Sequence, residues 1–195
     1  VIDPASGLDA TCDVGFANGR VAAVAPRIAE KADVEHDVAG AIVTPGMIDL
    51  HTHVYWGGTS IGVEAEPIAR RSGTTTFIDA GTAGPANFPG FRRHVIEPSP
   101  VRILAYLNVS FAGIFAFSRT VMVGESSDLR LLDLNECVRV ARENADLIVG
   151  IKVRVGRGAG GSSGVAPLDM ALEVADEVDL PLMAHIDHPP PSRKE

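Results

Sequence analysis

The sequence lacks any apolar stretch that approaches the roughly 18 residues of a membrane span. It also lacks runs of lysine or arginine, and its formal net charge is -8, so it has no basic patch of the kind that binds nucleic acids or anionic membranes. Cysteine is scarce. Cys12 and Cys137 lie far apart, which suits the reduced thiols of a cytoplasmic protein better than a disulfide framework. We therefore expect a cytoplasmic protein without nucleic-acid or membrane partners.

A nucleophilic serine or cysteine is not indicated either. The one G-x-S-x-G match, residues 160–164, falls in the glycine-rich stretch where we expect a flexible loop, and Cys137 falls within a predicted helix, where it is expected to pack in the core. The sequence therefore gives no support to hydrolysis through a covalent intermediate on a side chain.

Near-continuous apolar runs alternate with amphipathic segments along most of the chain. The runs are typical of strands buried on both faces of a parallel sheet. They cover residues 42–53, 73–81, 101–110, 146–155 and 180–186. The helices predicted between them cover residues 63–72, 88–96, 134–144 and 167–178. This alternation predicts an α/β protein, built either as an open doubly wound sheet or as a (β/α) barrel.

The number of strands bears on that choice. A (β/α)8 TIM-type barrel needs eight strands and typically about 250 residues, whereas this sequence offers five candidates and ends just after the fifth. We interpret the chain as such a barrel truncated after about five strands, with the open five-stranded sheet as the alternative. Earlier in the chain, Asn18 and Gly19 predict a type I′ hairpin within a small β unit. The expected domains are residues 1–43 and 44–195.

Two histidines at the end of the first apolar run suggest a metal site. His51 and His53 are two residues apart on a predicted strand, so both imidazoles project from one face and can converge on one ion. Neutral imidazole is a good zinc ligand, and barrel active sites gather where strands end. The simpler alternative is one histidine in the core and one on the surface by accident.

The segment TPGMIDLHTH resembles the first-strand signature of the amidohydrolase superfamily. The similarity continues through GTTTFIDAGTAG, LAYLNVSFAGI, GIKVRV and LPLMAHI, and is greatest to the dihydroorotase-like and D-aminoacylase-like deacetylase branch. It covers nearly the whole chain. The resemblance also implies that residues 1–43 are part of the small β-sandwich that flanks the barrel in this superfamily.

The resemblance implies a site with two divalent metal ions, zinc being the expected metal. His51 and His53 would hold one ion, His185 would bind the second, and Lys152, carboxylated by carbon dioxide, would bridge them. A further histidine and the general-base aspartate would come from strands beyond residue 195. Independently, a lysine within LIVGIKV is costly to bury as a cation, so it must snorkel, pair or be modified. The alternative is an ammonium paired with Asp79 or Asp187.

The function implied is hydrolysis of an amide or ester bond by metal-activated hydroxide. Expected substrates are a small acylated amino acid, an acylated hydroxy acid or a cyclic amide, and a homo-oligomer is possible. One alternative is a non-catalytic scaffold or an inactive fragment. Another is a dinucleotide-binding oxidoreductase, because Gly156, Gly158 and Gly161 match G-x-G-x-x-G. We expect a flexible active-site loop there instead, and surface positions for His36 and His94.

Overall fold

A computed structural model of the chain describes residues 1–189, and its contacts divide the chain into two units. The first is Val1–Met47 and the second begins at Ile48. The assignment of residues 1–43 to a β-sandwich stays a prediction.

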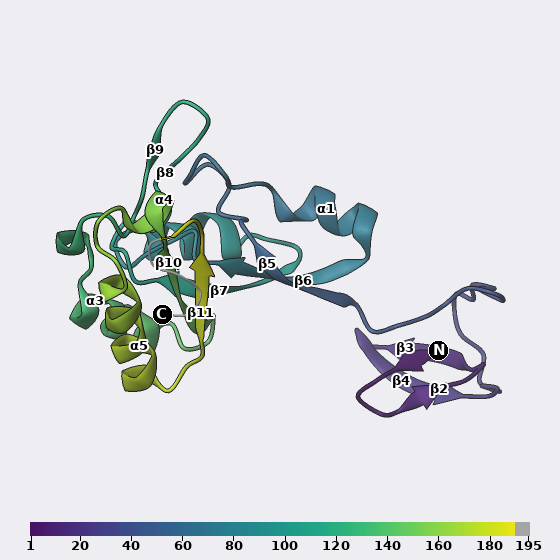
Figure 1. Cartoon of the computed structure of the whole chain (residues 1–195). Helices are drawn as coiled ribbons and strands as arrows, with labels where there is room; N and C mark the ends of the chain where they lie inside the picture. Colours follow the sequence, from purple (N-terminus) through teal and green to yellow (C-terminus); the bar gives the residue numbers. More distant parts are fainter. Residues whose placement is uncertain (190–195) are drawn as a thin grey trace. The chain divides into compact units, whose positions relative to one another are not determined.

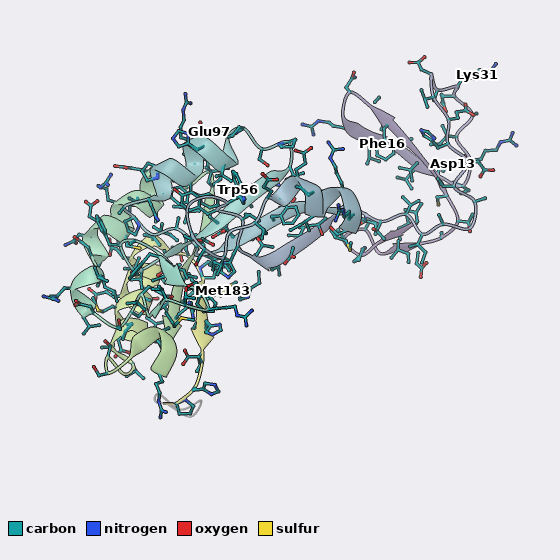
Figure 2. The ribbon with its side chains drawn as sticks, turned by 90° about the horizontal axis from the view of Figure 1, so that it is seen from above. Asp13, Phe16, Lys31, Trp56, Glu97 and Met183 are labelled. Carbon is teal, nitrogen blue, oxygen red and sulfur yellow. The ribbon has the colours of Figure 1, made fainter. Side chains whose placement is uncertain are left out.

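The first unit contains two antiparallel strand pairs. These are β1 (Ile2–Asp3) with β2 (Leu8–Asp9), and β3 (Asp13–Ala17) with β4 (Arg20–Ala25). Asn18 and Gly19 connect β3 to β4 with φ angles of 53° and 71°, and positive φ at both central residues is what a type I′ turn requires. The predicted hairpin is therefore confirmed. Phe16 on β3 is labelled in Figure 2 and is largely exposed.

The second unit is built on a curled, five-stranded parallel sheet (Figure 1). Its strands are β5 (Met47–Thr52), β6 (Thr74–Ala80), β7 (Arg102–Asn108), β10 (Ile148–Val155) and β11 (Leu182–Ile186). Their order across the sheet, β11-β10-β7-β6-β5, follows the sequence without a reversal. A doubly wound sheet reverses direction at a switch point, whereas a barrel adds each strand beside the previous one. The strand order therefore supports the barrel over the open sheet.

Helices follow the strands at all four predicted positions. They are α1 (Ala65–Ser72), α2 (Phe88–Phe91), α3 (Leu134–Glu143) and α5 (Ala166–Val178). The second differs from the prediction, because it continues as a π-helix, η1 (Arg92–Ile96), in which Glu97 N–H donates to Arg92 O. No helix within residues 1–189 is long and apolar enough to span a membrane.

Shorter elements occupy two of the connections between strands. The segment after β7 carries β8 (Ala116–Phe117), β9 (Met122–Val123) and the 3-10 turn η2 (Leu129–Leu131). After β10, Arg157–Gly160 forms a short helix, α4, where the sequence predicted a loop. Asp187 explains the difference, because its Oδ2 accepts hydrogen bonds from the N–H groups of Gly158 and Ala159 at 3.0 and 3.1 Å.

The core of the second unit lies between the sheet and its helices. Phe77 on β6, Leu107 on β7 and Ile151 on β10 are fully buried, and each such side chain stabilises the fold by about 1.5 to 3 kcal/mol. Cys137 on α3 is also fully buried, as predicted, and burial raises the pKa of its thiol to about 12. It is therefore a packing residue.

Candidate metal centre

The four predicted ligands lie at the same edge of the sheet. His51 is in β5 and His53 follows its last residue, while Lys152 and His185 lie in the carboxyl-terminal halves of β10 and β11. The pairing of β10 with β11 sets Arg154 opposite His185, and Lys152 opposite Met183, which is labelled in Figure 2. This is the edge at which the active sites of parallel barrels are found.

His51 and His53 are close neighbours. Their ring centroids are 5.7 Å apart with an interplanar angle of 71°. The pKa of His53 is lowered to about 4, mainly by burial and in addition by the positive charges of His51 and Lys152. Burial also lowers the pKa of the more exposed His51. Both rings are thus neutral at physiological pH, which is the form that binds metals.

Lys152 is buried, with 1% of its surface exposed. The pKa of its amine is lowered to about 8, mainly by burial and also by the positive charge of Arg154, while Glu125 and Asp79 oppose the shift. Among residues 1–189, Lys152 forms no ion pair with a carboxylate, so the predicted alternative of an ammonium paired with Asp79 or Asp187 receives no support. An amine with this lowered pKa is partly neutral near pH 7 and can react with carbon dioxide.

A glycine in the turn after β6 makes room for the side chain of Lys152. Gly81 follows β6 with a φ of 76°, and a Cβ atom there would overlap Cβ and Cγ of Lys152. A side chain at position 81 would therefore displace the lysine. The aliphatic part of Lys152 thus passes directly over the backbone that follows β6.

His185 completes the predicted set. Its ring is exposed, and its pKa is lowered by partial desolvation, then by Arg154 and Lys152, with a smaller contribution from His51. His51, His53, Lys152 and His185 therefore lie within electrostatic range of one another. Within residues 1–189, however, no three His, Cys, Asp or Glu side chains form a group able to hold a metal ion by themselves. The donor set suits zinc, but it needs the oxygens of a carboxylated lysine and further ligands to be complete.

Two functional candidates at this edge were not predicted as site residues. Asp79 is the penultimate residue of β6 and is fully buried, and Thr82 lies three residues later, also fully buried. The Thr82 hydroxyl donates to Asp79 Oδ2 at 2.8 Å and lies 2.8 Å from His53 Nδ1. The sequence offers one signal, an aspartate near the end of an apolar strand, for which the sequence predicts only a possible pairing with Lys152.

Arg154 was also missed, although it follows Lys152 by two residues and so shares its face of β10. Its guanidinium is almost buried, donates to Glu125 Oε2 at 3.4 Å and lies 4.8 Å from the ring centre of Phe117. Burial raises the pKa of Glu125, whose Oε1 has no hydrogen-bond partner among residues 1–189. These contacts tie the segment that carries β8 and β9 to the end of β10 and leave a fixed positive charge beside the candidate ligands.

The glycines after β10 have a structural explanation. Gly156 has a φ of 114°, and a Cβ atom there would overlap Oδ1 of Asp187. A Cβ atom at Gly158 would likewise come too close to Oδ2 of Asp187. The Asp187 carboxylate accepts hydrogen bonds from the backbone N–H groups at the start of α4. A dinucleotide phosphate would need these same N–H groups. The G-x-G-x-x-G pattern therefore serves this turn.

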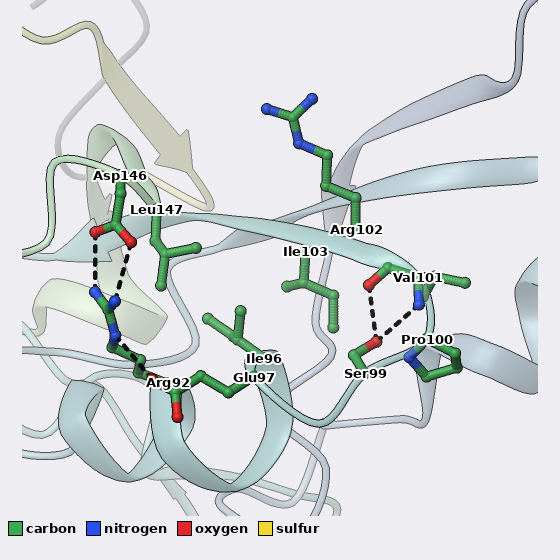
Figure 3. A pocket seen from close by; sticks show the side chains of 10 residues that line it. All are labelled: Arg92, Ile96, Glu97, Ser99, Pro100, Val101, Arg102, Ile103, Asp146 and Leu147. Carbon is green, nitrogen blue, oxygen red and sulfur yellow. Dashed lines mark hydrogen bonds and ion pairs between the residues drawn. The ribbon is translucent and has the colours of Figure 1, made fainter. Parts of the chain in front are cut away.

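A surface pocket lies at the opposite ends of the strands (Figure 3). It is formed by η1, the start of β7 and the residues before β10. Its polar groups bind one another: Arg92 donates to both carboxylate oxygens of Asp146, at 2.9 and 3.0 Å, and to Glu97 at 3.2 Å. We assign these ion pairs to the stability of the fold, since the amino-terminal face of such barrels is not where chemistry occurs.

Known proteins resemble this chain along most of its length. It is 40% identical to a deacetylase from Agrobacterium fabrum over 89% of the chain and 42% of that protein, and 40% identical to a deacetylase from Brucella anthropi over 93% of the chain and 45% of that protein. The chain thus spans about half the length of these relatives.

Solved structures give the same result. A dihydroorotase matches 94% of the chain and 49% of its own with a TM-score of 0.86 at 38% identity, and an adenine deaminase matches 93% and 48% with a TM-score of 0.79 at 27% identity. The model of the amidohydrolase family matches residues 42–193, which include all four candidate ligands. The chain therefore belongs to the amidohydrolase family.

Proposed function

We propose that this chain forms half of the active-site barrel of a metal-dependent hydrolase that cleaves amide or ester bonds of small molecules. The observation that carries the proposal is the gathering of His51, His53, Lys152 and His185 at one edge of the sheet, within electrostatic range of one another. Neutral histidines and an amine of lowered pKa suit metal binding rather than surface charge.

Each residue has a distinct task in this proposal. His51 and His53 would hold one ion and His185 the second, while Lys152, as a carboxylate, would bridge the pair. Two divalent ions, zinc being the expected metal, would polarise the scissile carbonyl and lower the pKa of a bound water toward about 7. Lys152 is buried at this position, and the contacts of Glu125 and Phe117 hold Arg154 beside it.

For the substrate, we propose a small acylated amino acid, an acylated hydroxy acid or a cyclic amide. The support is twofold. Relatives at 40% identity carry the name deacetylase, and a structural neighbour is a dihydroorotase. In addition, Arg154 places a permanent positive charge beside the candidate ligands, which favours a substrate with a carboxylate. A cytoplasmic location and a homo-oligomeric state stay predictions.

The test is hydrolysis by the full-length protein reconstituted with zinc. N-acetyl amino acids, an O-acetyl hydroxy acid and a cyclic amide are assayed beside the uncharged methylamides of the same acetyl amino acids. We expect turnover that a chelator abolishes and zinc restores, with preference for the carboxylates. The kcat/KM of the variant His51→Asn/His53→Asn should fall at least 1000-fold. This loss corresponds to about 4 kcal/mol of transition-state stabilisation.

A matched control is His36→Asn/His94→Asn, which changes two exposed histidines outside the site and should keep full activity. A protein that binds no zinc and hydrolyses none of these substrates would favour the non-catalytic scaffold. Activity that survives both the chelator and the His51→Asn/His53→Asn variant would refute the metal-dependent mechanism.

A further inference from the structure

The buried carboxylate of Asp79 is surrounded by hydrogen-bond donors. Its Oδ1 accepts from Thr82 N–H at 2.7 Å, and its Oδ2 accepts from Val54 N–H at 2.8 Å and from the Thr82 hydroxyl at 2.8 Å. The two amide groups can only donate, and a carboxylate with no exposed surface needs such partners to offset its loss of hydration. Asp79 is therefore an acceptor at each of these contacts.

This arrangement fixes the direction of the next hydrogen bond. The Thr82 hydroxyl has one hydrogen, and that hydrogen is donated to Asp79. The hydroxyl oxygen can then only accept from His53 Nδ1, which lies 2.8 Å away. The proton of the neutral His53 ring must accordingly be on Nδ1, which leaves the lone pair of Nε2 free.

We propose that Asp79 and Thr82 are positioning residues that lock His53 in the Nδ1–H tautomer and orient its Nε2 as a metal ligand. The inference rests on the proposed metal function, and it distinguishes the histidines of the site. Among residues 1–189, the side chains of His51 and His185 make no hydrogen bond of this kind, so His53 is the ligand whose orientation is set before any metal binds.

The hydrogen bonds of Asp79 also link two neighbouring strands. Asp79 belongs to β6, whereas His53 and Val54 follow β5, and the amide of Val54 donates to the same Oδ2 that accepts from Thr82. One carboxylate thus holds both the backbone beside His53 and, through Thr82, its ring. Because Asp79 binds backbone as well, its substitution risks the fold, and Thr82 is the better residue to change.

The test uses the full-length protein with Thr82→Val, which keeps the side-chain shape and removes the hydroxyl, and Thr82→Ser, which keeps the hydroxyl. Zinc affinity is measured by competition with a chromophoric chelator. We expect Thr82→Val to bind zinc about 10- to 100-fold more weakly, the usual effect of losing a group that supports a ligand, and Thr82→Ser to stay within about threefold of the unaltered protein.

Histidine tautomers are measured at neutral pH in the metal-free protein, by long-range proton–nitrogen NMR after labelling with 15N-histidine. His53 should show the Nδ1–H pattern in the unaltered protein and in Thr82→Ser, and lose it in Thr82→Val. The signals of His51 serve as the internal reference and should not change.

An Nε2–H pattern for His53 in the unaltered protein, or zinc affinity and tautomer both unchanged in Thr82→Val, would overturn the inference. A failure of the proposed function would look different. The unaltered protein would then bind no zinc, while the tautomer of His53 would still depend on the Thr82 hydroxyl.

Discussion

The buried Lys152 amine costs the fold stability in the absence of metal, because burial disfavours its charged form. The amine has a pKa of about 8 in the folded chain against 10.5 when free, so between these values the unfolded chain holds a proton that the folded chain has released. Stability of the metal-free protein should therefore rise with pH from about 8 to 10.5 on account of this group.

Replacing Lys152 by methionine should remove that contribution. We expect Lys152→Met to stabilise the metal-free protein at pH 7 by about 1 to 3 kcal/mol, measured by urea unfolding, with the advantage shrinking toward pH 10.5. Lys31→Met, at an exposed lysine of the first unit, should change little. A constant difference between Lys152→Met and the unaltered protein across this pH range would show that Lys152 carries no burial cost.

The sequence predicted some site residues better than others for a physical reason. His51 and His53 were found because side chains two apart on a strand share a face, and Lys152 because a cation within an apolar run needs an explanation. The contact between Thr82 and His53 joins residues 29 positions apart, so no local pattern contains it. Arg154 had the strand spacing, but its contact with Phe117 depends on the path of a long connection.

At the scale of elements, the turn from β10 into α4 gives a test of the Asp187 contacts. Gly156→Ala would place Cβ against the Asp187 carboxylate at a φ of 114°, whereas Gly164→Ala would meet open space at a φ of 61°. We expect Gly156→Ala to lower the free energy of unfolding by more than about 2 kcal/mol and Gly164→Ala by about 1 kcal/mol. Equal losses in thermal or urea unfolding would mean that Asp187 does not constrain this turn.

The secondary structure shows the limits of pattern recognition in the same way. Five strands and four helices were predicted because their apolar patterns extend over several residues, but β5, which was expected to be buried on both faces, is largely exposed at the edge of the sheet. The π-helical turn at Arg92–Ile96 and the four-residue α4 were not, since each depends on specific hydrogen bonds rather than on an apolar period. The predicted loop at α4 was wrong because Asp187, 29 residues after Gly158, caps that segment.

At the scale of the whole molecule, the sheet forms part of a barrel with two open edges. On the edge strand β5, Met47, Ile48 and Leu50 are each more than half exposed. The relatives are about twice as long as this chain, and a closed barrel of this type has eight strands. We therefore propose that the remaining ligands, a histidine and a general-base aspartate, come from sequence outside these 195 residues.

The most direct test of the account is the metal content of Lys152→Ala in the full-length protein, purified with zinc and bicarbonate and measured by mass spectrometry. The unaltered protein should hold about two zinc ions per chain, and the variant should lose most of them because the bridging carboxylate disappears with the amine. Acetate or formate should restore part of the metal and of the activity. A folded Lys152→Ala variant that keeps both ions and full turnover would contradict the bridging role of Lys152 and the two-metal site.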